Sequence, residues 1–303
     1  MNNYQCCTLC PRNCKINRYQ KRGFCGCNNK IRVALAKPFF YEEPPISGTN
    51  GSGTIFFSGC NLKCCFCQNI KISKYHNGID ISIKRLSEIM LELQKMRVHN
   101  INLVTPTMYM PSIIKAIKKA KRNGLNIPIV YNSSGYENVD AIKLLDGYID
   151  IYLPDFKYYD DTYAIKYSNA PNYLENAKES LKEMVRQTGP CKFNTDGIIQ
   201  KGVIVRHMML PNLLEDSKKI INYLYSEYHD NIYLSIMNQY TPFNYVKYKE
   251  LLKPIKESDY NTLIDYAVSL GINNAFCQVG GTVTDSFIPK FNLEGIKKNQ
   301  EIS

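Results

Sequence analysis

The stretch Gly59-Cys60-Asn61-Leu62-Lys63-Cys64-Cys65-Phe66-Cys67 directly follows a short apolar run at residues 54–58 that is typical of a buried strand. Its thiols Cys60, Cys64 and Cys67 have the spacing Cys-x3-Cys-x2-Cys. Three thiolates in one tight loop can hold three irons of a [4Fe–4S] cluster and leave the fourth iron open for another ligand. A structural zinc ion would need a fourth ligand and the spacing of paired knuckles. The loop therefore predicts an iron–sulfur cluster.

Beyond this loop, strand-like and helix-like segments alternate along the chain. Strands are predicted at residues 101–105, 127–131, 149–153, 202–207 and 232–237, and helices at 83–98, 111–122, 139–145, 174–187 and 214–228. Strands that alternate with helices form βαβ units and a parallel sheet. Six such units favour an incomplete barrel over a doubly wound sheet, although spacing alone does not separate the two. A last apolar segment is expected at 275–279.

Polar residues follow most of these strands, where ligands bind in parallel α/β proteins. The polar runs are residues 58–60, 105–107, 132–135, 155–157, 206–207 and 238–240. Charged side chains in several of these runs predict a binding site at this edge of the sheet, with His207 as a candidate lining residue.

The cysteines divide the chain, because ten of the twelve lie within the first 67 residues. A closed four-thiolate site is expected from Cys7, Cys10, Cys14 and Cys25, and it could hold either structural zinc or an auxiliary iron–sulfur cluster. Reactive or structural thiols remain an alternative, and the neighbouring cysteines are Cys6, Cys27 and Cys65, the last expected to be a packed thiol. We therefore divide the chain into a Cys-rich metal-binding lobe and linker (1–50), a core (51–243) and a C-terminal helical extension (244–303).

Length and composition are those of a globular protein with a sizeable core. The 303 residues are 44% hydrophobic and carry a net charge of +11. The positive charges are scattered, which favours a basic surface that attracts anionic ligands or an acidic partner over a nucleic-acid interface. No apolar stretch is long enough for a membrane span, and the first residues lack a secretory pattern. A cytoplasmic location is expected, where clustered thiols indicate metal rather than disulfides.

In these features the chain resembles the radical S-adenosylmethionine (SAM) superfamily. The resemblance rests on Cys60, Cys64 and Cys67, on the aromatic Phe66, and on the strand–loop–helix context. It implies a partial (β/α)6 TIM-type barrel with a [4Fe–4S] cluster whose open iron binds S-adenosylmethionine. Reductive cleavage of this cofactor gives a 5′-deoxyadenosyl radical, which abstracts hydrogen from a substrate.

More narrowly, the chain resembles the PflX-like group related to pyruvate formate-lyase activating enzyme. The sequence segments shared with this group include Cys7-Thr8-Leu9-Cys10-Pro11-Arg12-Asn13-Cys14, Gly23-Phe24-Cys25-Gly26, Glu42-Glu43-Pro44 and Met237-Asn238-Gln239-Tyr240. The resemblance implies a glycyl radical enzyme or another polypeptide as partner and a flavodoxin or ferredoxin-type electron donor. It also implies contacts to S-adenosylmethionine from Asn132, Ser134, Asp155, Lys157 and Arg206.

Two positions depart from the pattern of the group. Thr105-Pro106-Thr107 replaces the usual Gly-Gly-Glu, so recognition of the methionine amino group differs there. Met108 stands where the group has His, and no catalytic residue is assigned from the sequence.

Three function classes follow. The first is a radical enzyme that activates a glycyl radical partner, or alternatively a maturase or metabolite-modifying enzyme. The second is a non-enzymatic electron-transfer protein with two iron–sulfur clusters. The third is a nucleic-acid-binding module that is stabilised by zinc. Formation of 5′-deoxyadenosine separates the first from the second, and brown colour after anaerobic purification separates both from the third. The substrate itself is not readable from motifs.

Overall fold

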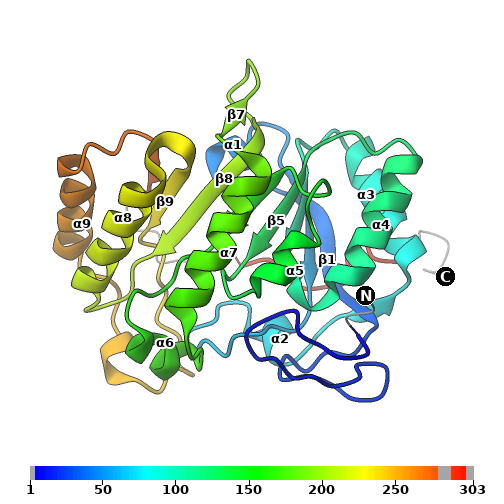
Figure 1. Cartoon of the computed structure of the whole chain (residues 1–303), viewed down its shortest axis with the longest axis horizontal. Coiled ribbons are helices and arrows are strands. Elements are labelled where there is room, and N and C mark those ends of the chain that lie inside the picture. The colour runs from blue at the N-terminus through cyan, green and yellow to red at the C-terminus, as the bar shows by residue number, and fades with distance from the viewer. Residues whose placement is uncertain (1–3, 279–287, 298–303) are drawn as a thin grey trace.

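A ten-stranded sheet organises the computed structural model, which describes residues 4–278 and 288–297 (Figure 1). Within these residues the strand order is β10-β9-β8-β6-β5-β4-β2-β1-β3, and β7 pairs with β8 beside this path. The strands are β1 (Ile31–Phe39), β2 (Ser52–Phe57), β3 (Ile79–Ile81), β4 (Ile101–Val104), β5 (Ile129–Ser133), β6 (Ile151–Pro154), β7 (Lys192–Phe193), β8 (Ile199–Met208), β9 (Tyr233–Met237) and β10 (Ala275–Cys277).

The longer helices connect the parallel strands and cover one face of the sheet (Figure 1). The helices of the described residues are α1 (Pro44–Ser47), α2 (Ile70–Ser73), α3 (Ile83–Lys95), α4 (Met110–Arg122), α5 (Val139–Lys143), α6 (Asp161–Ser168), α7 (Tyr173–Thr188), α8 (Leu214–Tyr228) and α9 (Glu257–Ser269). The Ser82 side chain caps α3 by accepting a hydrogen bond from the amide of Arg85. Apolar residues at helical spacing, such as Leu86, Ile89 and Leu93, then pack against the sheet.

The parallel strands β2, β4, β5, β6, β8, β9 and β10 follow one another across the sheet in chain order. A doubly wound sheet reverses this order at a switch point, and these seven parallel strands show no reversal. The sequential order fits the partial barrel that the resemblance implied. The expected alternation of strands and helices is confirmed.

The two-residue period of the strands separates the two faces of the sheet. On β5, Ile129 and Tyr131 pack in the cluster that includes the helices, whereas Val130 belongs to a smaller cluster with Ile46 of α1. Asn132 lies on the same face as Val130 because the two are two residues apart. The inner face is therefore apolar at the start of the strands and polar toward their carboxyl ends.

The strands predicted from the sequence leave out residues 1–50, where the structure has its first strand. Residues Ile31–Phe39 form β1, which pairs antiparallel with both β2 and β3. The segment lacks a clear polar–apolar alternation because Val33, Ala34 and Leu35 are all fully buried. The chain then turns through α1 at the amino-terminal edge of the parallel strands.

The last part of the chain also adds to the sheet. Residues 275–277 of the expected apolar segment form β10 beside β9, and residue 279 lies outside the described residues. In residues 4–278 and 288–297, no helix combines the length and apolar character needed to cross a bilayer. The division into lobe, core and extension stays a prediction.

Candidate functional site

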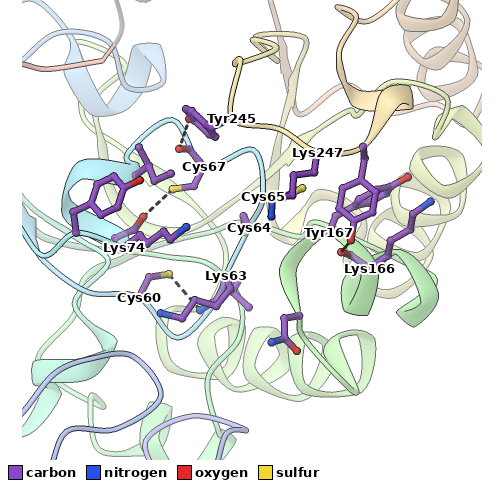
Figure 2. Close-up of a pocket in the computed structure, with 16 residues that line it drawn as sticks. Cys60, Lys63, Cys64, Cys65, Cys67, Lys74, Lys166, Tyr167, Tyr245 and Lys247 are labelled. Atoms are coloured by element: carbon purple, nitrogen blue, oxygen red, sulfur yellow. Dashed lines mark hydrogen bonds between the residues drawn. The ribbon is translucent and has the colours of Figure 1, made fainter.

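Three cysteines of the loop after β2 lie where two cavities meet. Cys60, Cys64 and Cys67 line an inner cavity of about 180 Å³ and also an outer cavity of about 540 Å³, whose lining Figure 2 shows. All three are free thiols. Cys65 borders the outer cavity, and its backbone amide donates to the carbonyl of Tyr167. The structure thus brings the three thiols of the predicted cluster together.

Each of these thiols has a polar neighbour at its sulfur. The Ser168 hydroxyl donates to Cys64 Sγ at 2.9 Å, and the Leu62 amide donates to Cys60 Sγ at 3.4 Å. Cys67 Sγ lies 3.2 Å from the hydroxyl of Ser73. Burial raises the pKa of all three thiols, to about 11 at Cys64. A bound metal centre reverses this effect, because it deprotonates the thiols that coordinate it.

The surroundings of the loop fit a bound cluster and cofactor. Asn69 lines the inner cavity, and its buried Oδ1 has no hydrogen-bond partner, so it could accept a bond from a bound molecule. Asn61 fixes the loop: its side chain donates to the Tyr136 carbonyl and accepts from the Ser134 hydroxyl at 3.3 Å. Three thiolates beside such a cavity are the donor set that a [4Fe–4S] cluster with one open iron requires.

The inner cavity also collects the five residues expected to contact S-adenosylmethionine. Its lining includes Asn132, Ser134, Asp155, Lys157 and Arg206. The Asp155 carboxylate accepts from Lys157 Nζ at 2.6 Å and from Arg206 Nε at 2.9 Å. Arg206 Nη2 donates to Asn132 Oδ1 at 2.7 Å. The structure places these residues together, while their role toward the cofactor stays a prediction.

Glu42 belongs to the same network and was not singled out from the sequence as a site residue. Its carboxylate accepts from Arg206 Nη1 at 3.2 Å and from Asn102 Nδ2 at 3.0 Å. It reaches the inner face from the turn between β1 and α1. The sequence shows the acidic residues Glu42 and Glu43 before Pro44. Their position beside Arg206 depends on β1, which was not predicted from the sequence.

The charges in this network shift one another's pKa. Burial raises the pKa of Glu42 to about 7, against the attraction of Arg206. At Asp155, burial favours the neutral acid, but Arg206 and Lys157 outweigh it and lower the pKa. At Lys157, burial favours the neutral amine, but Asp155 and Cys64 raise the pKa. Asp155, Lys157 and Arg206 therefore stay charged at neutral pH.

Thr105, the first residue of the segment that replaces Gly-Gly-Glu, has a strained backbone. Its φ is +57°, in the left-handed region that β-branched residues rarely occupy. Its amide donates to the Asn132 carbonyl at 2.8 Å, and the residue lines the inner cavity. The backbone at the end of β4 therefore has a conformation that suits glycine, although Thr105 stands where the related group has glycine.

Replacing Thr105 with Gly is expected to raise the free energy of unfolding by about 1 kcal/mol, because the relieved strain exceeds the added chain entropy. Urea denaturation measures this change. The matched variant Thr262→Gly, in the regular helix α9, is expected to lose roughly 0.5 kcal/mol. Equal destabilisation by both substitutions would show that Thr105 is not strained.

Thr107, the last residue of the same segment, pairs with a buried carboxyl group. Its hydroxyl donates to Glu137 Oε1 at 2.8 Å, and the Ser133 hydroxyl lies 3.2 Å from Oε2. Glu137 is fully buried, and this burial raises its pKa to about 7 despite both hydrogen bonds.

Glu137 gives a pH dependence of stability with a definite sign. Its folded pKa of about 7 exceeds the unfolded value of 4.5, so its contribution is complete below pH 4.5 and is lost as the pH rises through 7. Relative to Glu137→Gln, the native protein is expected to lose about 3 kcal/mol of unfolding free energy between pH 4.5 and 7.5. Urea titrations of both proteins at several pH values test this, and parallel pH profiles would contradict it.

Two other residues marked in the sequence lie away from both cavities. His207 is buried, and its ring nitrogens contact the Phe156 carbonyl at 2.8 Å and the Ser217 hydroxyl at 2.9 Å. Its position next to Arg206 on β8 turns it to the helix-covered face, so the expectation that it lines the site is wrong. Met108 is also buried, and its carbonyl accepts a hydrogen bond from Arg18.

The segment that carries the amino-terminal thiols reaches the loop after β2, where Arg12 Nε donates to the Asn61 carbonyl at 3.0 Å. A Cβ added at Gly23 would lie 3.5 Å from Cys25 Sγ and 3.6 Å from Cys14 Sγ, so these two sulfurs are neighbours. The buried Arg18 reaches to within 4.0 Å of Cys7 Sγ. Burial and the nearby thiols Cys25, Cys7 and Cys14 raise the pKa of Cys10 to about 12. No three His, Cys, Asp or Glu side chains of the described residues are arranged to hold a single metal ion.

A family model and a sequence relative each match more than half of the chain. The model of the Radical SAM superfamily matches residues 54–224, more than half of the chain. An uncharacterized protein of Methanocaldococcus jannaschii is 32% identical over 250 residues, which cover 80% of this chain and 68% of that protein.

Two solved structures are among those similar to this chain. Streptococcus suis SuiB bound to S-adenosylmethionine is 16% identical with a TM-score of 0.48, over 75% of this chain and 50% of SuiB. A domain of pyruvate-formate lyase-activating enzyme from Bacteroides vulgatus is 11% identical with a TM-score of 0.40, over 57% of this chain and 94% of that domain. The chain thus spans about half the length of SuiB.

The match across residues 54–224 includes the three thiols, the strands from β3 to β8 and the charged residues of the inner cavity. This chain therefore belongs to the radical SAM superfamily of enzymes, which implies a [4Fe–4S] cluster and S-adenosylmethionine.

Proposed function

We propose that this enzyme abstracts hydrogen from a polypeptide and activates a glycyl radical partner, as a member of the PflX-like group. When bound, the cluster and S-adenosylmethionine supply the 5′-deoxyadenosyl radical that removes this hydrogen. Cys60, Cys64 and Cys67 hold the cluster in this proposal. Asp155, Lys157 and Arg206 orient the cofactor in the inner cavity.

The lining of the inner cavity is the observation that favours a polypeptide. Among its described residues, the charged ones are Asp155, Lys157 and Arg206, and these are paired with one another. The partly exposed residues of the same lining include the neutral Gln68, Gln239 and Thr241. Neutral amides and hydroxyls suit a peptide backbone, whereas a charged metabolite would need an unpaired charge of opposite sign.

The test is anaerobic incubation of the reconstituted enzyme with candidate glycyl radical proteins and S-adenosylmethionine. Electron paramagnetic resonance is expected to show a glycyl doublet on the partner, together with 5′-deoxyadenosine. If S-adenosylmethionine is cleaved but no candidate protein shows a glycyl doublet, the maturase or metabolite-modifying alternative is favoured. Absence of cleavage with intact clusters would favour the two-cluster electron-transfer protein.

We also propose that Cys7, Cys10, Cys14 and Cys25 form a second, independent metal site that holds zinc or an auxiliary iron–sulfur cluster. The proximity of Cys14 to Cys25 and the buried Arg18 beside Cys7 support it. A hydrogen bond with Cys27 and the charge of Arg18 lower the pKa of Cys25 to about 6, which favours the thiolate form that binds metal. Metal analysis of a variant without Cys60, Cys64 and Cys67 is expected to find zinc or iron. A metal-free variant would show that the early thiols do not bind metal on their own.

A further inference from the structure

The outer cavity has a different chemistry from the inner one. Its lining includes the lysines Lys63, Lys74, Lys166 and Lys247 and the tyrosines Tyr75, Tyr167, Tyr245 and Tyr248. No acidic residue is part of this lining in the described chain. Figure 2 shows Lys74 on one side of the thiols and Lys166 on the other. The cavity is a basic and aromatic surface built directly over the predicted cluster.

Two of these lysines are available to a partner. Lys74 and Lys247 are exposed, and neither forms an ion pair with the described residues. Lys166 pairs with Glu250 at 2.6 Å, which fixes its position at the rim. Tyr75 is 62% exposed although it is a large aromatic residue. Tyrosine is enriched at protein interfaces, and the charges of the unpaired lysines attract an acidic partner.

One wall of the outer cavity, at residues 245–248, is hydrogen-bonded to the loop that carries Cys60, Cys64 and Cys67. The Tyr245 hydroxyl donates to the carbonyl of Cys67 at 2.8 Å (Figure 2). The Tyr248 hydroxyl donates to the Lys166 carbonyl at 2.9 Å. The segment after Tyr240 therefore packs against the loop and α6 and gives the surface a fixed shape.

The position of the cavity indicates which partner it serves. A molecule in it would touch the edges of Cys60, Cys64 and Cys67, but the residues expected to hold S-adenosylmethionine, such as Asp155 and Arg206, line the inner cavity instead. A substrate must reach the radical carbon of the cofactor and so needs the inner cavity. A reductant needs access to the cluster alone.

We propose that the outer cavity is the docking surface for a small acidic one-electron donor protein of the flavodoxin or ferredoxin type. The donor loses one electron, which passes to the cluster held by the three thiols, and no atom or proton is transferred in this step. Opposite charge on the donor accelerates its association and fixes its orientation. The inference rests on the proposed radical chemistry. It adds the surface on which the protein that supplies the electron docks.

The experiment compares two variants of equal net charge in the reconstituted enzyme. Lys74→Glu/Lys247→Glu reverses two charges of the outer cavity. The control Lys119→Glu/Lys121→Glu reverses two exposed lysines in the last turn of α4, which line neither cavity. Binding of an oxidised acidic flavodoxin is measured by calorimetry at low and high salt. Formation of 5′-deoxyadenosine is measured with reduced flavodoxin and, separately, with photoreduced 5-deazariboflavin, a small uncharged donor.

The cavity variant is expected to bind flavodoxin at least about tenfold more weakly at low salt and to lose flavodoxin-driven cleavage to a similar degree. High salt should remove much of the difference. The control should behave like the native enzyme, and both variants should keep deazariboflavin-driven cleavage. Equal flavodoxin binding by the two variants would overturn the proposal.

Two further outcomes separate this proposal from the function that it rests on. If the cavity variant keeps flavodoxin binding and cleavage but no longer modifies its polypeptide partner, the surface binds substrate, and the donor proposal is wrong. If even the native enzyme fails with deazariboflavin despite an intact cluster, the radical chemistry itself is wrong.

Discussion

Replacing Cys60, Cys64 and Cys67 together with Ala is expected to reduce cleavage of S-adenosylmethionine to the level of an enzyme-free control. These thiols are the ligands expected to hold the catalytic cluster, and removing all three removes its attachment. The strands and helices should remain, because the thiols are only partly buried and lie in a loop beyond the end of β2. Anaerobic reconstitution followed by measurement of 5′-deoxyadenosine, iron content and circular dichroism tests this.

Cys65 supplies the matched control, since it lies in the same loop and is also partly buried. The variant Cys65→Ala is expected to keep the catalytic cluster and the cleavage reaction, because this residue is off the ligand spacing and borders the outer cavity. Cleavage that survives in the triple variant, or is lost in Cys65→Ala, would assign the cluster to another set of thiols.

The local part of the site was predictable because its residues are close in the chain. The spacing of three thiols within eight residues needs no knowledge of the fold, and the polar runs after strands follow from the rule that ligands bind at this edge of a parallel sheet. The structure places the predicted Asn132, Asp155 and Arg206 in one cavity for that reason.

The parts that were missed depend on contacts between distant segments. Glu42 reaches Arg206 across 164 positions, and only the antiparallel pairing of β1 with β2 brings it there. His207 was grouped with Arg206 because the two are adjacent, although the two-residue period puts them on opposite faces. The register of β8 places Val205 and His207 on one face and Ile204 and Arg206 on the other. A stricter use of the alternation would have separated this pair.

Replacing Arg206 with Leu is expected to lower the free energy of unfolding by about 3–5 kcal/mol at pH 7.5, because it leaves two carboxylates without their shared guanidinium in a buried network. Arg206 is 17% exposed and contacts Asp155, Glu42 and Asn132. Without Arg206, the pKa of Glu42 should rise further above its unfolded value, so the additional loss of stability should grow as the pH rises. Urea denaturation at pH 5.5 and 7.5 should therefore show the smaller penalty at the lower pH.

The variant Arg186→Leu is the appropriate comparison, because it breaks ion pairs of similar length at the surface. Arg186 contacts Asp146 at 2.6 Å and Glu183 at 2.8 Å, but its side chain is 56% exposed. Water and salt screen such pairs, so its loss should change stability far less than loss of Arg206 and with little dependence on pH. Equal effects of the two substitutions would show that burial does not strengthen the inner network. A large effect confined to Arg206 would show that the charged residues of the inner cavity are held in place before any cofactor binds.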